Sequence, residues 1–250
     1  MARRSFSEDG CPPMGFEMDA IQLKDIIAEL KSMEDPEAAA GMARYGINAA
    51  QALGISIPGL QGLAKNIGKN HKLAGELWSC GIHEARILAC MIDDPQQVAE
   101  AQLERWVKEF NSWDLCDQCC NRLFRRSEFA HQKALAWACR PDEFVKRAGF
   151  VLMAVLAVHD KKAADRQFEP FFGLIKKEAV DRRNFVKKAV NWALRQIGKR
   201  NLSLNKKAIA VAEEIQQFES KTARWVASDA LRELRSENIR KRLSSGPTMS

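Results

Sequence analysis

The residues best placed to do chemistry in this sequence lie in one short stretch, Asn111–Phe124. Asn111 or Ser112 can cap a helix that begins at Trp113. Trp113 and Asp117 then lie one turn apart, so an indole and a carboxylate share one face of that helix. Asp117 is too far inside the helix to act as its cap. This carboxylate beside an indole is therefore the candidate reactive centre of the chain.

A different face of the same predicted helix is apolar. Cys116, Cys119, Cys120 and Leu123 follow the i, i+3, i+4, i+7 spacing of a buried stripe. Cys116 and Cys119 resemble half of a zinc site, but no second half with suitable spacing lies near them. The seven cysteines of the chain lie mostly in apolar helical patterns. They favour core packing in a reducing compartment over a disulfide framework, and we predict no metal and no cofactor.

A second candidate surface lies on the predicted helix Asn184–Lys199. Lys188, Trp192, Arg195 and Lys199 fall at i, i+4, i+7 and i+11, which gives a basic face containing one indole. Lysine and arginine neutralise phosphates, and an indole can stack on a base or sugar, so this face favours a nucleic-acid partner. The alternative fits the lysines equally well: a solvated helix face, with Trp192 packed against a neighbouring helix.

Arg147 directly precedes eleven residues without a charge, Ala148–Val158. An arginine that enters so apolar a helix must extend to solvent or find an anion. One interpretation is a structural salt bridge to Asp114 or Asp142. The other places Arg147 in a groove as a bidentate contact to a DNA phosphate.

Composition limits the class of protein. The chain has 250 residues, of which 46% are hydrophobic and 28% charged, enough to bury the core of one large domain or of a repeat array. Helix-forming residues dominate and there is one tyrosine, so an all-α fold is favoured. The net charge of +7 suits a polyanionic partner. No signal peptide or membrane-length apolar stretch is evident, and we expect a cytoplasmic monomer.

About a dozen helices joined by short turns are predicted, including one over Ala163–Ala179. Phe144–Ala148 recurs as Phe185–Ala189 after 41 residues, and Trp192–Arg195 recurs as Asp229–Arg232 after 37. Repeats near 40 residues with two helices each are typical of HEAT-like arrays, which stack into a curved solenoid with a concave surface.

These patterns divide the chain into three parts. Residues 1–17 carry no periodicity and are predicted to form a flexible arm. Residues 18–235 are predicted to form the HEAT-like solenoid, and residues 236–250 a frayed, flexible tail.

Three motifs stand in order along the chain. They are Asn111-Ser112-Trp113-Asp114-x-x-Asp117, then Phe144-x-x-Arg147, then Lys187-Lys188-Ala189-x-x-Trp192-Ala193-Leu194-Arg195. Together they resemble the AlkD-type DNA alkylation repair glycosylases, which are built of HEAT-like repeats. The resemblance extends over about Tyr45 to Leu234, and one departure is Gln61, where relatives often carry a basic residue.

The resemblance implies hydrolysis of the N-glycosidic bond of cationic N3- or N7-alkylated purines in double-stranded DNA, without a base-flipping pocket. Asp117 matches the catalytic aspartate, Trp113 and Trp192 match two groove-facing tryptophans, and Arg147 and Arg195 match DNA contacts. With Lys188 and Lys199 on the basic face, these arginines make up the predicted DNA-binding set.

Elementary chemistry agrees with that implication. Departure of a cationic purine leaves positive charge on the sugar, which a nearby carboxylate stabilises. The leaving base is already positive, so no strong general acid is needed, and neutral lesions should be poor substrates.

Two alternatives stay open: a DNA-binding protein of the same fold without catalysis, and a protein-interaction scaffold.

Overall fold

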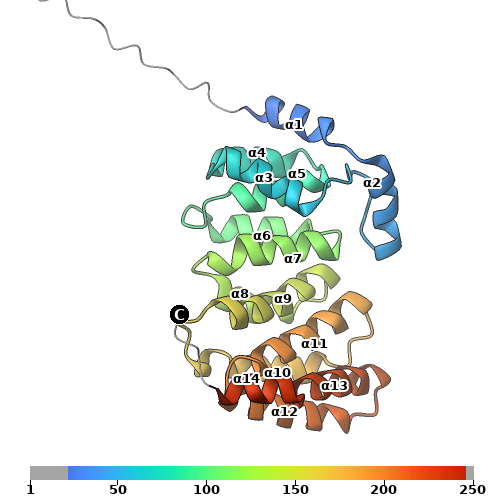
Figure 1. Cartoon of the computed structure of the whole chain (residues 1–250), viewed down its shortest axis with the longest axis vertical. Helices are drawn as coiled ribbons and strands as arrows, with labels where there is room; N and C mark the ends of the chain where they lie inside the picture. The colour runs from blue at the N-terminus through green and yellow to red at the C-terminus, as the bar shows by residue number, and fades with distance from the viewer. Residues whose placement is uncertain (1–21, 246–250) are drawn as a thin grey trace, which may run out of the picture.

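The structure is a computed structural model that describes residues 22–245 (Figure 1). The predicted arm, residues 1–17, lies outside the described residues. The described part consists of α-helices and short 3-10 turns without a strand. The first helices are α1 Leu23–Ser32, α2 Pro36–Met42, α3 Ile57–Ile67, α4 His71–Ser79, α5 His83–Ile92, α6 Glu100–Lys108 and α7 Trp113–Arg122. They continue as α8 Ala130–Ala138, α9 Glu143–His159, α10 Glu169–Glu178, α11 Asn184–Gly198, α12 Leu202–Gln216, α13 Lys221–Leu234 and α14 Glu237–Ser244.

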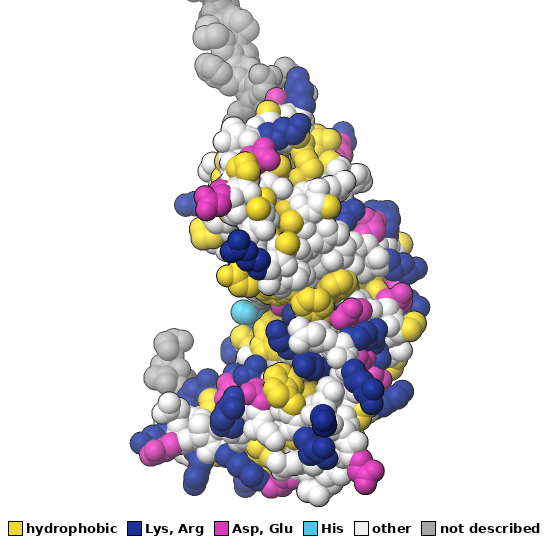
Figure 2. Space-filling view, turned by 90° about the vertical axis from the view of Figure 1, so that its right-hand side faces the viewer, with side chains coloured by type: hydrophobic (Ala, Val, Ile, Leu, Met, Phe, Trp, Pro, Cys, Tyr) yellow, Lys and Arg dark blue, Asp and Glu magenta, His cyan; other side chains and the backbone are white. Residues whose placement is uncertain are grey.

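From α4 onward the helices alternate between two layers. The outer layer contains α4, α6, α8, α10 and α12, and the inner layer contains α5, α7, α9, α11 and α13. Helices of the inner layer pack on one another more closely than those of the outer layer, so the array curves toward the inner layer. Figure 2 shows the resulting hollow in the outline of the molecule. This architecture confirms the prediction of an all-α HEAT-like solenoid.

The centre of the core is α9, which is buried from Val145 to Ala157. Its long apolar run fits a helix covered by neighbours on several sides. At Gly149 the backbone of α8 approaches so closely that an added Cβ would lie 2.3 Å from the backbone nitrogen of Ala138. Only glycine allows this helix crossing. No helix among residues 22–245 combines the length and apolarity that a membrane crossing needs.

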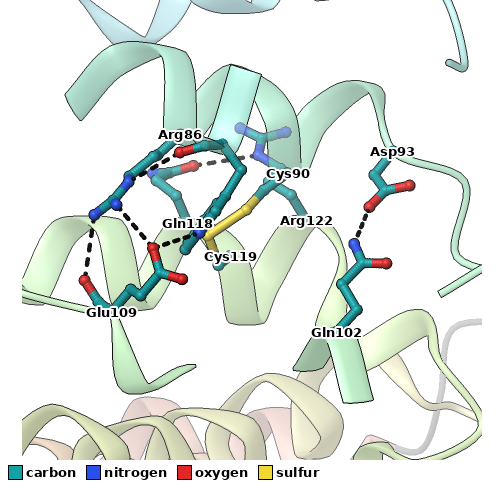
Figure 3. The surroundings of a disulfide bond; sticks show 9 residues. Arg86, Cys90, Asp93, Gln102, Glu109, Gln118, Cys119 and Arg122 are labelled. Atoms are coloured by element: carbon teal, nitrogen blue, oxygen red, sulfur yellow. Dashed lines mark hydrogen bonds and ion pairs between the residues drawn. A yellow bond between two sulfur atoms is a disulfide. The ribbon is translucent and has the colours of Figure 1, made fainter. Parts of the chain in front are cut away.

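The cysteine stripe of α7 is buried as predicted, with Cys116, Cys119 and Cys120 fully inaccessible. The expectation of free thiols is wrong for two residues, because Cys119 forms a disulfide with Cys90 of α5 (Figure 3). Their Cα atoms lie 5.3 Å apart, within the range that a disulfide spans. Helical periodicity identifies the buried face but not the residue of the neighbouring helix that meets it.

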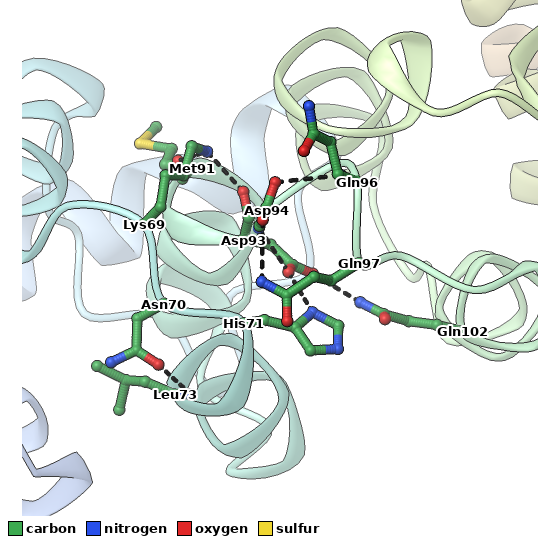
Figure 4. A network of polar contacts seen from close by, with 10 residues as sticks. All are labelled: Lys69, Asn70, His71, Leu73, Met91, Asp93, Asp94, Gln96, Gln97 and Gln102. Carbon is green, nitrogen blue, oxygen red and sulfur yellow. Dashed lines mark hydrogen bonds and ion pairs between the residues drawn. The ribbon is translucent and has the colours of Figure 1, made fainter.

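A polar network fixes the turn between α5 and α6 (Figure 4). The buried Asp93 carboxylate contacts His71 at 2.6 Å and accepts a hydrogen bond from Gln102 at 2.6 Å. The ammonium of Lys69 donates to the backbone carbonyl of Asp93. The start of α4 is thereby tied to the end of α5, which holds consecutive helix pairs in register.

Residues 34–54 leave the solenoid and return to it, and we call this segment the strap. It contains α2 and the 3-10 turn Ala43–Tyr45. At its base Asp35 donates its N–H to the carbonyl of Leu53 at 2.8 Å. The buried Glu84 carboxylate accepts from the N–H groups of Leu53 and Gly54, both at 2.8 Å. The strap is therefore closed at its base by α5.

The C-terminal end differs from the prediction of a frayed tail after residue 235. Residues Glu237–Ser244 form α14, and the hydroxyl of Ser236 accepts a hydrogen bond from the N–H of Ile239 as a helix cap. This short, strongly charged helix buries none of its residues. Its low apolar content explains why the sequence pattern did not indicate it.

Candidate active site

The centre of the site is an ion pair between neighbouring inner helices. Asp117 of α7 accepts from Arg147 of α9 through both oxygens: Nε to Oδ1 at 3.0 Å, and Nη2 to Oδ2 at 2.8 Å. This is the bidentate geometry that a guanidinium and a carboxylate favour. Nη1 of Arg147 donates to the carbonyl of Phe185 on α11 at 2.6 Å. One guanidinium therefore connects three successive inner helices.

The pair is largely withdrawn from solvent, with 7% of the Arg147 side chain and 21% of the Asp117 side chain exposed. Burial raises the pKa of Asp117 above its usual range, and the opposing charge of Arg147 offsets only part of that effect. Burial would lower the pKa of Arg147, but Asp117 outweighs it and raises the pKa. Because a bidentate pair needs an ionised carboxylate, the candidate catalytic charge is present and largely balanced by its neighbour.

Trp113, one turn before Asp117, adjoins this pair. The Arg147 guanidinium carbon lies 6.0 Å from the centre of the Trp113 ring, within cation–π range. The indole Nε1 donates to the carbonyl of Tyr45, at the tip of the strap, at 3.0 Å. The indole, the guanidinium and the carboxylate are thus held together, with the strap anchoring the indole.

The tip of the strap reaches still farther along the solenoid. Gly46 has a φ of 74°, in the left-handed region that favours glycine. A Cβ at Gly46 would lie 2.8 Å from the ring of Phe185 on α11. The strap therefore contacts both α7 and α11, the two inner helices that flank α9.

Between the strap and the inner helices lies an open cavity of about 540 Å³. Its size falls in the range of ligand sites in proteins. Asp117 is not one of the lining residues of this cavity. It contacts Arg147, which is one of them. Lys188 is exposed there and has no carboxylate partner within 4.0 Å among residues 22–245. The lining residues are Arg44, Tyr45, Gly46, Trp113, Arg147, Asn184, Phe185 and Lys188.

The other predicted residues of α11 lie apart from this cavity. Trp192, one turn beyond Lys188, is half-buried and packs against the core. Arg195 and Lys199 each contact the Glu233 carboxylate of α13 at 2.6 Å. The basic face is therefore partly neutralised by α13, while its predicted role in DNA binding stays a prediction.

The sequence interpretation missed several partners. Of the two acids proposed for Arg147, Asp114 instead contacts His83 at 2.8 Å, and the arginine pairs with Asp117. The strap was not predicted to be part of the site, although Tyr45 stands in the segment that carries the family resemblance. The repeat carried one signal for an acid near Arg195, because Asp229 occupies the position of Trp192 one repeat later; it did not indicate Glu233, the nearer acid.

Comparison with known proteins decides the family. The model of the family described as DNA alkylation repair enzyme matches residues 26–234. The chain belongs to this family. A search of curated proteins gave no match.

Among solved structures, one similar protein belongs to a new family related to the HEAT-like repeat DNA glycosylases, with affinity for branched DNA structures. It is 20% identical, aligned over 86% of this chain and 96% of its own, with a TM-score of 0.71. At that identity the likeness establishes the solenoid fold alone. A designed armadillo repeat protein is 14% identical over 85% of this chain and 100% of its own, with a TM-score of 0.36, too low to bear on function.

Proposed function

We propose that the protein is a DNA glycosylase that releases cationic N3- or N7-alkylated purines from duplex DNA. The observation that carries the proposal is the grouping of Trp113, Asp117 and Arg147 beside an open cavity of the inner face. Membership of the DNA alkylation repair family supports it. The exposed Lys188 at the cavity edge supplies a cation for a DNA phosphate.

In the proposed reaction, the bond between the sugar and the alkylated purine breaks and its electron pair leaves with the base, which becomes neutral. Positive charge develops on the sugar, and water adds to C1′ and loses a proton to solvent. Each oxygen of a carboxylate has two acceptor positions, so Asp117 can hold Arg147 and still face the sugar or the water. The Trp113 ring face favours the same cation.

Arg147 has a positioning role in this scheme. Its three donating nitrogens are engaged with Asp117 and Phe185, so it fixes the carboxylate relative to the cavity. We expect Lys188, rather than Arg147, to make the main electrostatic contact with DNA at this point.

The direct test is base release from duplexes that contain 3-methyladenine or 7-methylguanine. Asp117→Asn keeps the shape of the side chain but removes its charge, so we expect a rate loss of about a hundredfold or more. Asp114→Asn is the matched control, because Asp114 lies on the same helix but pairs with His83. Its rate should stay near that of the wild type.

Thermal melting must accompany this test, because Asp117→Asn leaves the buried Arg147 without its counter-charge. Full base release by a folded Asp117→Asn protein would place the reactive centre elsewhere. A wild-type protein that releases neither methylated base would refute the glycosylase proposal itself.

A second candidate function is DNA binding without base release. Two observations favour it: Arg147 occupies both Asp117 oxygens, and a relative of the same fold is described as having affinity for branched DNA. In that case Asp117→Asn would leave DNA affinity near wild type, with no base release by either protein.

Both candidate functions require DNA to bind on the inner face. The salt dependence of the affinity reports which cations of this face contact phosphates. Lys188→Ala should lower the slope of log affinity against log salt by about one unit. Arg195→Ala and Lys199→Ala should each have a smaller effect, because Glu233 already balances them. Glu233→Gln should strengthen binding to any duplex, and weaker binding would contradict the assignment of this face.

A further inference from the structure

One aromatic side chain outside the candidate active site is unusually exposed. Trp225 of α13 has 42% of its surface accessible, whereas Trp78, Trp106 and Trp137 are at most 2% exposed. The ammonium of Lys187 on α11 lies 5.2 Å from the centre of the Trp225 ring. A single exposed apolar side chain is ordinary on a protein surface, so the meaning of this indole depends on the face and the charges around it.

The repeat places Trp225 on the inner face. It follows Lys188 by 37 residues, the offset that relates α11 to α13. The same register brings Asn191 of α11 to donate to the carbonyl of Val226 at 3.0 Å. Trp225 therefore continues, on α13, the row that Arg147 and Lys188 form on α9 and α11.

The charge around Trp225 is positive and unbalanced. Cations at the beginning of α11 and α13 have no carboxylate within 4.0 Å in the part of the chain that the structure describes; they are Lys187, Lys188, Lys221 and Arg224. Farther along the same helices, Arg195 and Arg232 are each paired with acids of α13. The exposed indole therefore lies at the end of the helix pair where the cations remain available to a ligand.

We propose that Trp225 and Lys187 form a stacking site for an unpaired nucleobase of a DNA strand bound on the inner face. Aromatic rings among cations bind bases in this way, because every base has a π-face and every nucleotide a phosphate. Inside a paired duplex both faces of each base are covered by neighbours, and only the two terminal pairs expose a face. A base at this site replaces the ammonium on the indole, and Lys187 moves to the phosphate.

The geometry also sets where the unpaired base lies. Neighbouring packed helices are about 8–10 Å apart, so two steps, from α9 to α13, separate Trp225 from Arg147 by about 18 Å. At 3.4 Å per base pair, that distance corresponds to about five pairs. The expected ligand is a duplex that carries an unpaired nucleotide about five pairs from the base at the cavity.

The inference rests on the proposed function in taking DNA as the partner and in placing the target base at the cavity. Its test compares binding of three fluorescent probes: a blunt duplex, the same duplex with one unpaired nucleotide, and a single strand. The wild type should prefer the two probes with unpaired bases. Trp225→Ala should lower affinity for those probes by about 5- to 150-fold and change blunt-duplex affinity far less.

Two further variants separate stacking from charge. Trp225→Phe keeps an aromatic face and should retain most of the preference for probes with unpaired bases. Lys188→Ala should lower the affinity for all three probes by a similar factor. Melting temperatures of the variants verify folding. The proposal would be overturned if the wild type bound all three probes with equal affinity. It would also be overturned if Trp225→Ala lowered the affinity for all three probes equally. Binding of polyglutamate that depends on Trp225 and excludes the DNA probes would overturn it in favour of an acidic protein partner.

Base release by the wild type on a methylated blunt duplex is measured separately. Preference for unpaired bases without base release would support the stacking site and refute the glycosylase proposal. Base release without that preference would support the glycosylase proposal and refute the stacking site. Cross-linking of a 5-bromouracil at the unpaired position, mapped by mass spectrometry, should identify Trp225 directly.

Discussion

The close crossing of α8 and α9 makes Gly149→Ala an informative perturbation. Gly149 lies two residues beyond Arg147, on the helix that carries the central ion pair. An added methyl group would lie 2.3 Å from the nitrogen and 2.8 Å from the Cα of Ala138. Both are backbone atoms, so no side-chain rotation can relieve the overlap. The two helices must move apart.

The cost follows from these contacts. Overpacking a close-packed core costs about 1–3 kcal/mol, and backbone neighbours place this position near the upper value. Replacing glycine by alanine inside a helix returns about 0.5–1 kcal/mol. The net loss should be about 2 kcal/mol, which in a chain of this size lowers the melting temperature by about 4–8 °C.

Calorimetry or circular dichroism measures this shift, with Gly173→Ala as the matched control. Gly173 is exposed inside α10, and a methyl group there meets nothing within 4 Å. That variant should melt about 1–4 °C higher than the wild type. If Gly149→Ala melted at or above the wild-type temperature, close backbone packing would not be the reason for glycine at this crossing.

Three further predictions concern stability. Reducing the Cys90–Cys119 disulfide, which joins residues 29 apart in sequence, should lower the free energy of unfolding by about 3–4 kcal/mol in denaturant titrations. Burial of the Asp114 carboxyl acts to raise its pKa. The hydrogen bond and charge of His83 outweigh burial and hold that pKa below its usual range. The stability that Asp114 contributes should therefore be present above its unfolded pKa of about 4 and be lost as pH falls through the lower folded pKa. The stability difference between the wild type and Asp114→Asn should shrink from pH 5 to pH 3. Glu84→Ala removes the acceptor at the base of the strap; a loss of about 3 kcal/mol and faster proteolysis between residues 34 and 54 should follow, and unchanged proteolysis would show that Glu84 does not hold the strap.

Much of the fold could be predicted because helical periodicity and repeat offsets are local signals. Helix α7 begins at the predicted residue, Trp113. The predicted helix Ala163–Ala179 begins only at Glu169, because Asp165–Gln167 forms a 3-10 turn before it. Pro170, at the start of α10, was the available signal for that boundary.

The candidate site was predictable only within single helices. Trp113 and Asp117 share a face of α7 because helix geometry requires it, and their proximity in the structure follows. The pairing of Asp117 with Arg147 depends on how α7 and α9 are placed side by side. These two residues are 30 apart in sequence, a spacing that the repeat offsets of 41 and 37 residues did not indicate. The neutralisation of Arg195 by Glu233 has the same origin.

The strap makes this solenoid different from a simple repeat array. In a simple repeat array each unit touches only its neighbours, so unfolding can begin at either end and progress unit by unit. Here the strap tip binds Trp113 of α7 and lies against Phe185 of α11, bypassing α9. Loss of α11 therefore also costs the N-terminal segment its contacts. The strap thus makes the unfolding of distant repeats cooperative, and it fixes the curvature of the inner face before any ligand arrives.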